Sequence, residues 1–160
     1  MSRMNMKLKL TSAGILVAVA IGTLAIRVAR ATPAQGVTAT LVAGPVSLDE
    51  ANVKSNEDGL RIKIQTKGDW ISRIMRYSVA PGGTFGWHSH PGPAIVLVTA
   101  GTLTSHEADG STEDHPQGTG FVHAPGDVHI AGNEGTTPLE LFVMFVTPEG
   151  ENPRIDEPQP

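Results

Sequence analysis

Cysteine is absent from the sequence. Without thiols the chain has no disulfide framework, thiol nucleophile, thiolate zinc site or iron–sulfur cluster. Aromatic residues are also scarce, at 4%, and charged residues make up only 18% of the chain. What the chain does contain is 18 glycines and 12 prolines among 160 residues. Turn-forming residues at that density predict one domain built from many short strands.

Acidic residues are missing from the first 31 positions, which hold five of the 12 basic residues of the chain. All 16 acidic residues therefore belong to residues 32–160, and that part of the chain has a marked excess of negative charge. A surface of this sign is unsuited to nucleic acid or anionic lipid. We expect no nucleic-acid partner. The sequence also has no glycine-rich phosphate loop and no G-x-S-x-G motif, so nucleotide binding and serine hydrolysis are unsupported.

Residues 1–31 combine basic residues with an apolar run from Leu10 to Ile26 and end in Ala29-Arg30-Ala31. This order is typical of a secretory signal peptide. An uncleaved membrane anchor stays open as an alternative, because the run has about the minimum length for crossing a bilayer and Arg27 and Arg30 follow it. We expect an apolar N-terminal helix, exporting or tethering a domain outside the cytoplasm (secreted or periplasmic), with membrane contact through this segment alone.

The remainder shows short apolar runs separated by turns, and no convincing helical periodicity. Residues 32–45 are interpreted as a linker and first strand, and residues 149–160 as a proline-rich extended tail. Strict alternation or continuous apolar character predicts the clearest strands. These are Thr38–Val42, Leu60–Ile64, Trp70–Val79, Ala94–Thr99 and Leu139–Val146. The pattern predicts an all-β barrel or sandwich.

Two histidines form the sequence His88-Ser89-His90 directly after a glycine-rich turn. In a strand, residues i and i+2 point to the same side with their Cα atoms about 7 Å apart, so both imidazoles can bind one ion. A pair of this kind also occurs on solvated strand faces, and by itself it is a weak signal. A third histidine, His129, follows the turn Pro125-Gly126.

The glycines around these histidines make the pattern more specific. Gly82, His88, His90 and Gly101 are spaced as in the first motif of the cupin superfamily, and Gly126, His129 and Asn133 as in the second. The chain resembles this superfamily over roughly residues 70–147. The resemblance implies a double-stranded β-helix, or jelly-roll barrel, over residues 46–148. It also implies a divalent metal ion held by His88, His90 and His129, and a possible homodimer.

Two positions depart from the family pattern. Ala94 stands where the family usually has a glutamate ligand, and Pro125 directly precedes Gly126 without an intervening residue. Three neutral imidazoles around a divalent ion leave the site with a formal charge of about +2 and with open coordination positions. Such a site favours a small anionic substrate and can activate water or dioxygen. Imidazole ligands suit iron, manganese, zinc, nickel and copper, so the metal stays open.

His123 lies six residues before His129. It is a candidate fourth ligand or substrate contact, and the alternative is a histidine that merely flanks a turn. His106 and His115 fall in the polar stretch Ser105–Thr119, where we expect a solvated hairpin and no metal ligand.

Together these features predict an exported single-domain cupin with one divalent metal. The resemblance implies a metal-dependent oxygenase, or a related lyase or isomerase, that acts on a small polar or anionic molecule. The alternative is a non-catalytic cupin that binds a small ligand or a metal. A fold of this kind supports many chemistries, so the fold alone does not separate the two.

Overall fold

The computed structural model describes residues 31–160. The helix predicted within residues 1–31 therefore lies outside the described residues, except for its last position, Ala31. Within the described part of the chain, no helix has the length and apolar character that crossing a membrane requires. The predicted all-β class is confirmed, and each of the five strands predicted above lies within an observed strand. The strands are β1 (Gln35–Leu48), β2 (Asn52–Glu57), β3 (Leu60–Gln65), β4 (Trp70–Ser89), β5 (Ala94–Ala100), β6 (Thr102–Glu107), β7 (Thr112–Pro116), β8 (Gly120–His123), β9 (His129–Gly132), β10 (Leu139–Pro148) and β11 (Ile155–Asp156).

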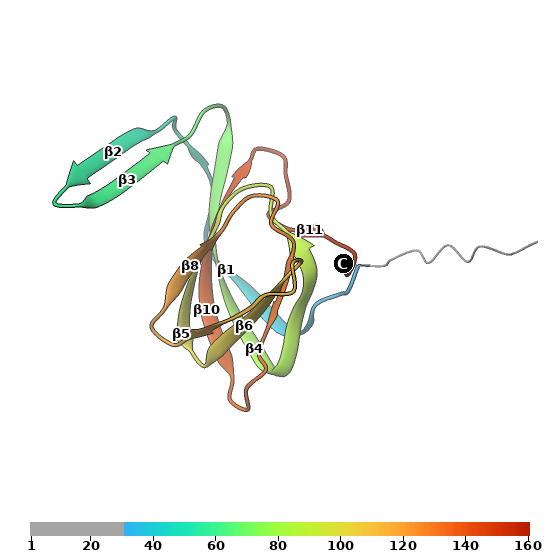
Figure 1. The fold of residues 1–160 in the computed structure, drawn as a ribbon. Helices are drawn as coiled ribbons and strands as arrows, with labels where there is room; N and C mark the ends of the chain where they lie inside the picture. The colour runs from blue at the N-terminus through green and yellow to red at the C-terminus, as the bar shows by residue number, and fades with distance from the viewer. Residues whose placement is uncertain (1–30) are drawn as a thin grey trace, which may run out of the picture.

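Nine strands form one strongly curved antiparallel sheet, which wraps into a nearly closed barrel (Figure 1). Its central path runs β7-β6-β9-β4-β10-β5-β8, while β1 and β11 also pair with β4. Sequence neighbours are often not sheet neighbours, as in β9 between β4 and β6. This winding of strands back and forth is that of a jelly-roll barrel.

Strand β4 belongs to both halves of the barrel because it bends at a pair of glycines. Before the bend it pairs with β1 and β10, and after it with β9 and β11. Gly83 and Gly132 cross so closely that a Cβ atom on Gly132 would lie 2.6 Å from the Gly83 carbonyl oxygen. The motif residue Asn133 secures this crossing, since its buried amide donates to the carbonyls of Val79 (2.9 Å) and Thr137 (2.8 Å). Asn133 thus has a structural role.

Alternating side chains from the strands fill the barrel. β10 shows the pattern most clearly, because every second residue from Leu139 to Phe145 is buried. Ala94, Val96 and Val98 share one face of β5 and are buried as well. The buried apolar core consists of Val79, Ala94, Val96, Val98, Leu103, Ala131, Leu139, Leu141, Val143 and Phe145.

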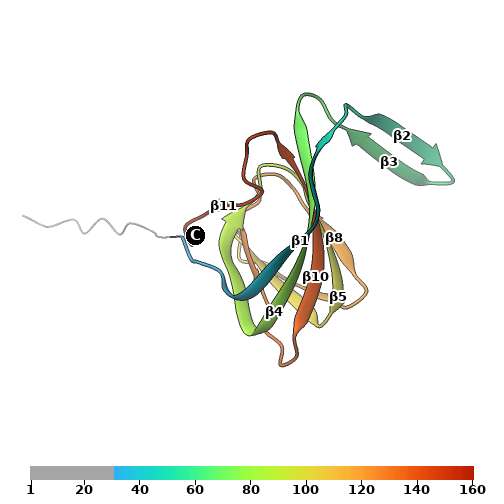
Figure 2. The same ribbon diagram turned by 180° about the vertical axis from the view of Figure 1, so that it is seen from behind.

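Strands β2 and β3 form a separate two-stranded hairpin that projects from one end of the barrel, on the side of β5 and β8 (Figures 1 and 2). Cross-strand pairing puts Val53 opposite Ile64, so these apolar side chains share a face with Ile62 and Leu60. All four of these side chains are more than half exposed. The hairpin therefore presents an apolar face outside the barrel.

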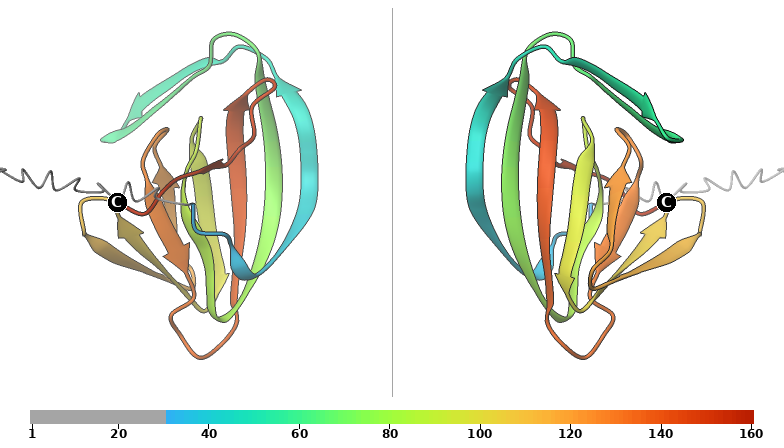
Figure 3. Two further views of the ribbon diagram at one scale, coloured as in Figure 1. Left: turned by 90° about the vertical axis from the view of Figure 1, so that its right-hand side faces the viewer. Right: turned by 90° about the vertical axis from the view of Figure 1, so that its left-hand side faces the viewer.

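Residues 149–160 fold back onto the barrel, where β11 pairs with His88 and Ser89 at the end of β4. Their last residues meet the start of the described chain through a β-bridge between Ala31 and Pro158. Figure 3 shows this meeting of the two ends beside the barrel. The C-terminal segment thus lies directly against the strand that carries the first two motif histidines.

Candidate metal centre

The three motif histidines come together at one end of the barrel. His88 lies on β4 and His90 directly follows it, while His129 begins β9 and pairs with His88 across the two strands. All three are at least nine-tenths buried. One ring nitrogen from each lies within 4.8 Å of the others, so the group could hold a metal ion. The structure thus brings together residues separated by 41 positions because β9 pairs with the bent half of β4.

Each of these rings is fixed by a hydrogen bond from its Nδ1 atom to a backbone carbonyl. His88 donates to Gly86 (2.8 Å), His129 donates to Asp127 (3.0 Å), and His90 donates to Pro153 (2.6 Å) in the C-terminal segment. A carbonyl oxygen only accepts, so Nδ1 carries the proton in all three rings. The lone pair then resides on Nε2, which is the arrangement found in histidines that ligate metals.

The rings differ in orientation in a way that suits convergence on one point. The planes of His88 and His90 are 86° apart with centroids at 4.9 Å, and those of His88 and His129 are 60° apart at 4.3 Å. Because the imidazole lone pair lies in the ring plane, rings at large angles can direct their Nε2 atoms to a common ion. The donor set, three neutral imidazoles, suits a divalent transition metal.

Burial keeps this group uncharged. It lowers the pKa of His88 from 6.5 to about 2, and that of His129 to about 4, with neighbouring histidines adding to the effect. Burial also lowers the pKa of His90. At neutral pH the three rings are therefore neutral, as metal binding requires.

His123, the last residue of β8, stacks on His129 with ring centroids 3.7 Å apart and planes within 8° of parallel. It lies directly opposite Ala94 in the pairing of β5 and β8, so the small side chain at the family's glutamate position faces this imidazole. Burial lowers the pKa of His123 to about 3, so this ring is neutral too. The structure therefore places His123 beside the triad, as a neighbour of one ligand candidate.

Glu107 is a residue of this region that the sequence did not single out. It ends β6, pairs with His129 across the strands, and offers a carboxylate oxygen within 4.8 Å of a nitrogen of both His123 and His129. Burial raises its pKa. Its position could have been suspected from the parity it shares with the buried residues Leu103 and Ser105.

A cavity of about 260 Å³ opens onto the histidines. Its walls are mostly apolar and come from both halves of the barrel, including β1, β4, β5 and β10. His88, His90, His123 and His129 all line it. An ion at the triad would therefore face a partly open cavity large enough for a small organic molecule.

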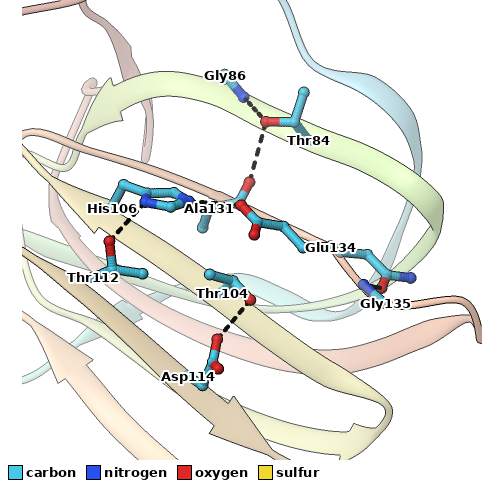
Figure 4. Close-up of polar contacts among 10 residues, drawn as sticks. Thr84, Gly86, Thr104, His106, Thr112, Asp114, Ala131, Glu134 and Gly135 are labelled. Atoms are coloured by element: carbon cyan, nitrogen blue, oxygen red, sulfur yellow. Dashed lines mark hydrogen bonds and ion pairs between the residues drawn. The ribbon is translucent and has the colours of Figure 1, made fainter.

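The other two histidines lie elsewhere. His106 is partly exposed and bonds to Thr112 (2.8 Å) and Glu134 (2.6 Å), as Figure 4 shows. His115 is buried on β7 and stacks on Phe121 with centroids 3.7 Å apart. Neither joins the triad, as expected, but the polar stretch around them forms two regular strands, and His115 is a packed side chain instead of a solvated one.

The profile of the family described as the cupin domain matches residues 75–145. A cupin-like protein from Thermotoga maritima shares 21% identity, with 58% of this chain and 79% of that chain covered and a TM-score of 0.50. A cupin domain from Bordetella pertussis shares 17% identity, with 70% of this chain and 94% of that chain covered and a TM-score of 0.49. An oxalate oxidase in complex with the substrate analogue glycolate shares 26% identity, with 53% of this chain and 45% of that chain covered and a TM-score of 0.44. No curated protein matches the chain.

The family match extends from β4 to β10 and includes all three histidines of the triad. The similarity to the Thermotoga protein is a similarity of fold. The resemblance inferred from the two histidine motifs is therefore confirmed over residues 75–145, which match the cupin domain family.

Proposed function

We propose that the protein binds one divalent metal ion through the Nε2 atoms of His88, His90 and His129, and that it is a metal-dependent enzyme acting on a small anionic molecule. The observation that carries this proposal is the set of Nδ1-to-carbonyl hydrogen bonds, which leaves three Nε2 lone pairs free at the base of a cavity. An ion bound there supplies Lewis-acid or redox chemistry, with dioxygen or water as the co-reactant.

The residues around the triad define what a bound substrate meets. The apolar walls exclude water and bind the carbon skeleton. His123 lines the cavity and is uncharged, so its ring can form a hydrogen bond with a substrate. Its ring is nearly parallel to that of His129, which makes the two in-plane lone pairs run side by side and disfavours a shared ion. We assign His123 to substrate contact, in preference to fourth ligand.

A non-catalytic binding protein is the second candidate. Ala94 favours it, because the site lacks the carboxylate that the family usually supplies, and so do cavity walls with few polar groups. A binding protein of this kind would retain metal and ligand without turnover. Oxygen uptake or product formation with the metal-loaded protein separates the two candidates.

Metal analysis tests the common part of both candidates. The full chain is purified in mild detergent without a metal-affinity step, and its metal content is measured by mass spectrometry. We expect about one equivalent of iron, manganese, zinc, nickel or copper, and a loss of more than tenfold in His88→Ala and His129→Ala. His106→Ala is the matched control, since this histidine bonds only on the outside of the barrel. Equal metal content in all four proteins would contradict the site.

We further propose that the domain works outside the cytoplasm, either after cleavage near Ala31 or tethered by residues 1–31. The support is the basic, acid-free and apolar character of this segment. Mass spectrometry of the N-terminus after expression with and without an active export system tests it: a Met1 N-terminus on soluble cytoplasmic protein would contradict export.

A further inference from the structure

Arg154 supplies the cavity with a positive charge. Most of the described residues that line the cavity are apolar, and four are histidines whose pKa is lowered by burial. Arg154 also lines the cavity, and its guanidinium group carries a positive charge. It reaches the cavity from the C-terminal segment. A substrate in the cavity thus meets the histidines, Tyr77, apolar walls and one guanidinium group.

The C-terminal segment holds Arg154 firmly against the metal-binding strand. Glu157 anchors it by accepting a hydrogen bond from the Ser89 hydroxyl (2.7 Å) and by donating its amide to the Trp87 carbonyl (3.1 Å). On the other side of Arg154, the Pro153 carbonyl accepts the hydrogen bond from His90 Nδ1. The backbone of Arg154 is therefore fixed between two contacts to the same strand.

The guanidinium group itself is only partly satisfied. Its Nε donates to the Asp156 carboxylate at 2.6 Å, whereas its Nη2 is buried and has no hydrogen-bond partner among residues 31–160. A buried cationic donor without a partner is costly, and such groups in native proteins call for an explanation. A carboxylate in the cavity would accept from Nη2 and remove this cost, because arginine forms its strongest hydrogen bonds with carboxylates.

We infer that Arg154 binds the carboxylate of the substrate, and that the substrate is a monocarboxylic acid with a compact apolar body. This inference rests on the proposed function, because it takes the cavity to be the substrate site. One guanidinium among apolar walls matches one carboxylate on an apolar skeleton. A second charged group that lies against those walls, away from Arg154 and the triad, would be buried without a partner.

Benzoate and its neutral analogue benzyl alcohol test this assignment in the full chain. Binding is measured by NMR saturation transfer and by isothermal titration on protein freed of metal with EDTA, so that no carboxylate binds an ion. We expect saturable benzoate binding that Arg154→Met weakens by about tenfold or more, the effect of losing one charge-assisted hydrogen bond. Benzyl alcohol should bind equally to both proteins.

Two further variants serve as controls. Arg76→Met removes an arginine that pairs with Glu140 on the outer side of the barrel, and it should leave benzoate binding unchanged. Asp156→Asn releases the guanidinium from its ion pair while keeping the charge, and it should bind benzoate at least as tightly as the unmodified chain. This second variant keeps the test valid if Arg154→Met disturbs the C-terminal segment.

The inference is overturned if benzoate does not bind, if it binds Arg154→Met as tightly as the unmodified chain, or if benzyl alcohol binds as tightly as benzoate. Failure of the proposed function has a different signature. It shows as absence of metal in the unmodified chain, which leaves the measurement on metal-free protein unaffected. Arg154→Met should retain its metal, since its ligand histidines are intact.

Discussion

Single hydrogen bonds decide the chemistry of each histidine in the triad. A histidine whose Nδ1 proton is engaged by a carbonyl presents an unprotonated Nε2, and partners of this kind typically change metal affinity by about 10- to 100-fold. In this protein all three partners are backbone atoms. The tautomer of each ring therefore depends on the backbone path of Gly86, Asp127 and Pro153 and not on neighbouring side chains.

Buried neutral histidines make the metal-free protein sensitive to mild acid. The pKa values of His88, His123 and His129 are lowered from 6.5 to about 2, 3 and 4. Below pH 6.5 the unfolded chain takes up protons that the folded chain does not, so stability falls as the pH falls from 6.5 towards 4. Each such histidine costs about 2 kcal/mol at pH 5 relative to neutral pH.

Urea unfolding of the metal-free protein at pH 7.5 and at pH 5 measures this loss. His123→Gln is the matched variant, because it removes one titrating ring next to the triad and should reduce the pH dependence by about 2 kcal/mol. A free energy of unfolding that stays constant between these pH values would contradict the burial of neutral histidines. With zinc added, the free energy of unfolding should fall more steeply between pH 7.5 and pH 5, since protons compete with the ion for the histidines.

The three triad histidines could be predicted because their spacing on two strands is a local property of the sequence. The contact of Arg154 with the cavity could not be predicted from the sequence. Arg154 reaches the cavity only because the C-terminal segment folds back along β4. A proline-rich segment of twelve residues has no periodicity that would reveal such a contact.

Among the elements, β4 determines the geometry of the site. Its twenty residues serve two halves of the barrel, and its bend positions the triad beneath the cavity. The alternation of apolar residues predicts the first half of β4, and Pro81-Gly82-Gly83 predicts that the strand ends there. In the structure the strand continues through this stretch, because the glycines permit a close crossing with β9 that an interrupted strand would not make. Pairing across the barrel thus overrides a local turn signal.

Gly86 offers a test of this strand. It has φ +72°, a Cβ atom there would collide with the backbone carbonyl of Thr32, and its own carbonyl holds His88. Gly86→Ala should therefore destabilise the fold by about 2 kcal/mol or more and weaken metal binding. Urea unfolding and competition with a chelator measure the two effects.

Gly110 is the matched control for that substitution. It also has a positive φ, of +86°, but no atom lies within 4 Å of a Cβ placed on it. Gly110→Ala carries only the backbone strain of about 1 kcal/mol and should leave metal affinity unchanged. Equal losses in both variants would mean that the approach of Thr32 to Gly86 contributes nothing.

At the scale of the whole molecule, apolar side chains remain exposed on one side of the barrel. They include Ile95 and Leu97 on β5 and Val122 on β8, near the side from which the apolar hairpin β2–β3 projects. A two-stranded hairpin is marginally stable alone. We propose that a second copy of the chain covers this side, with each hairpin packing on its partner, because a twofold arrangement buries both apolar surfaces at once.

Light scattering during size-exclusion chromatography of residues 31–160 tests the dimer. We expect twice the mass of one chain, and a dimer dissociation constant raised by more than tenfold in Ile62→Ser, since two apolar side chains are lost per dimer. Arg61→Ser lies on the opposite face of the same strand and should leave the mass unchanged. A monomer at micromolar concentration would contradict the proposal.

The bridge between Ala31 and Pro158 has a practical consequence for handling this protein. The C-terminus and Ala31 lie beside the segment that carries Pro153 and Arg154, so an affinity tag fused at the C-terminus, or directly before Ala31 in a shortened chain, would sit close to a residue that lines the cavity. Polyhistidine in that position could compete for the very ion under study. The turn at Asp58-Gly59, at the tip of the hairpin and remote from the triad, is the better place for a label or an immobilisation handle.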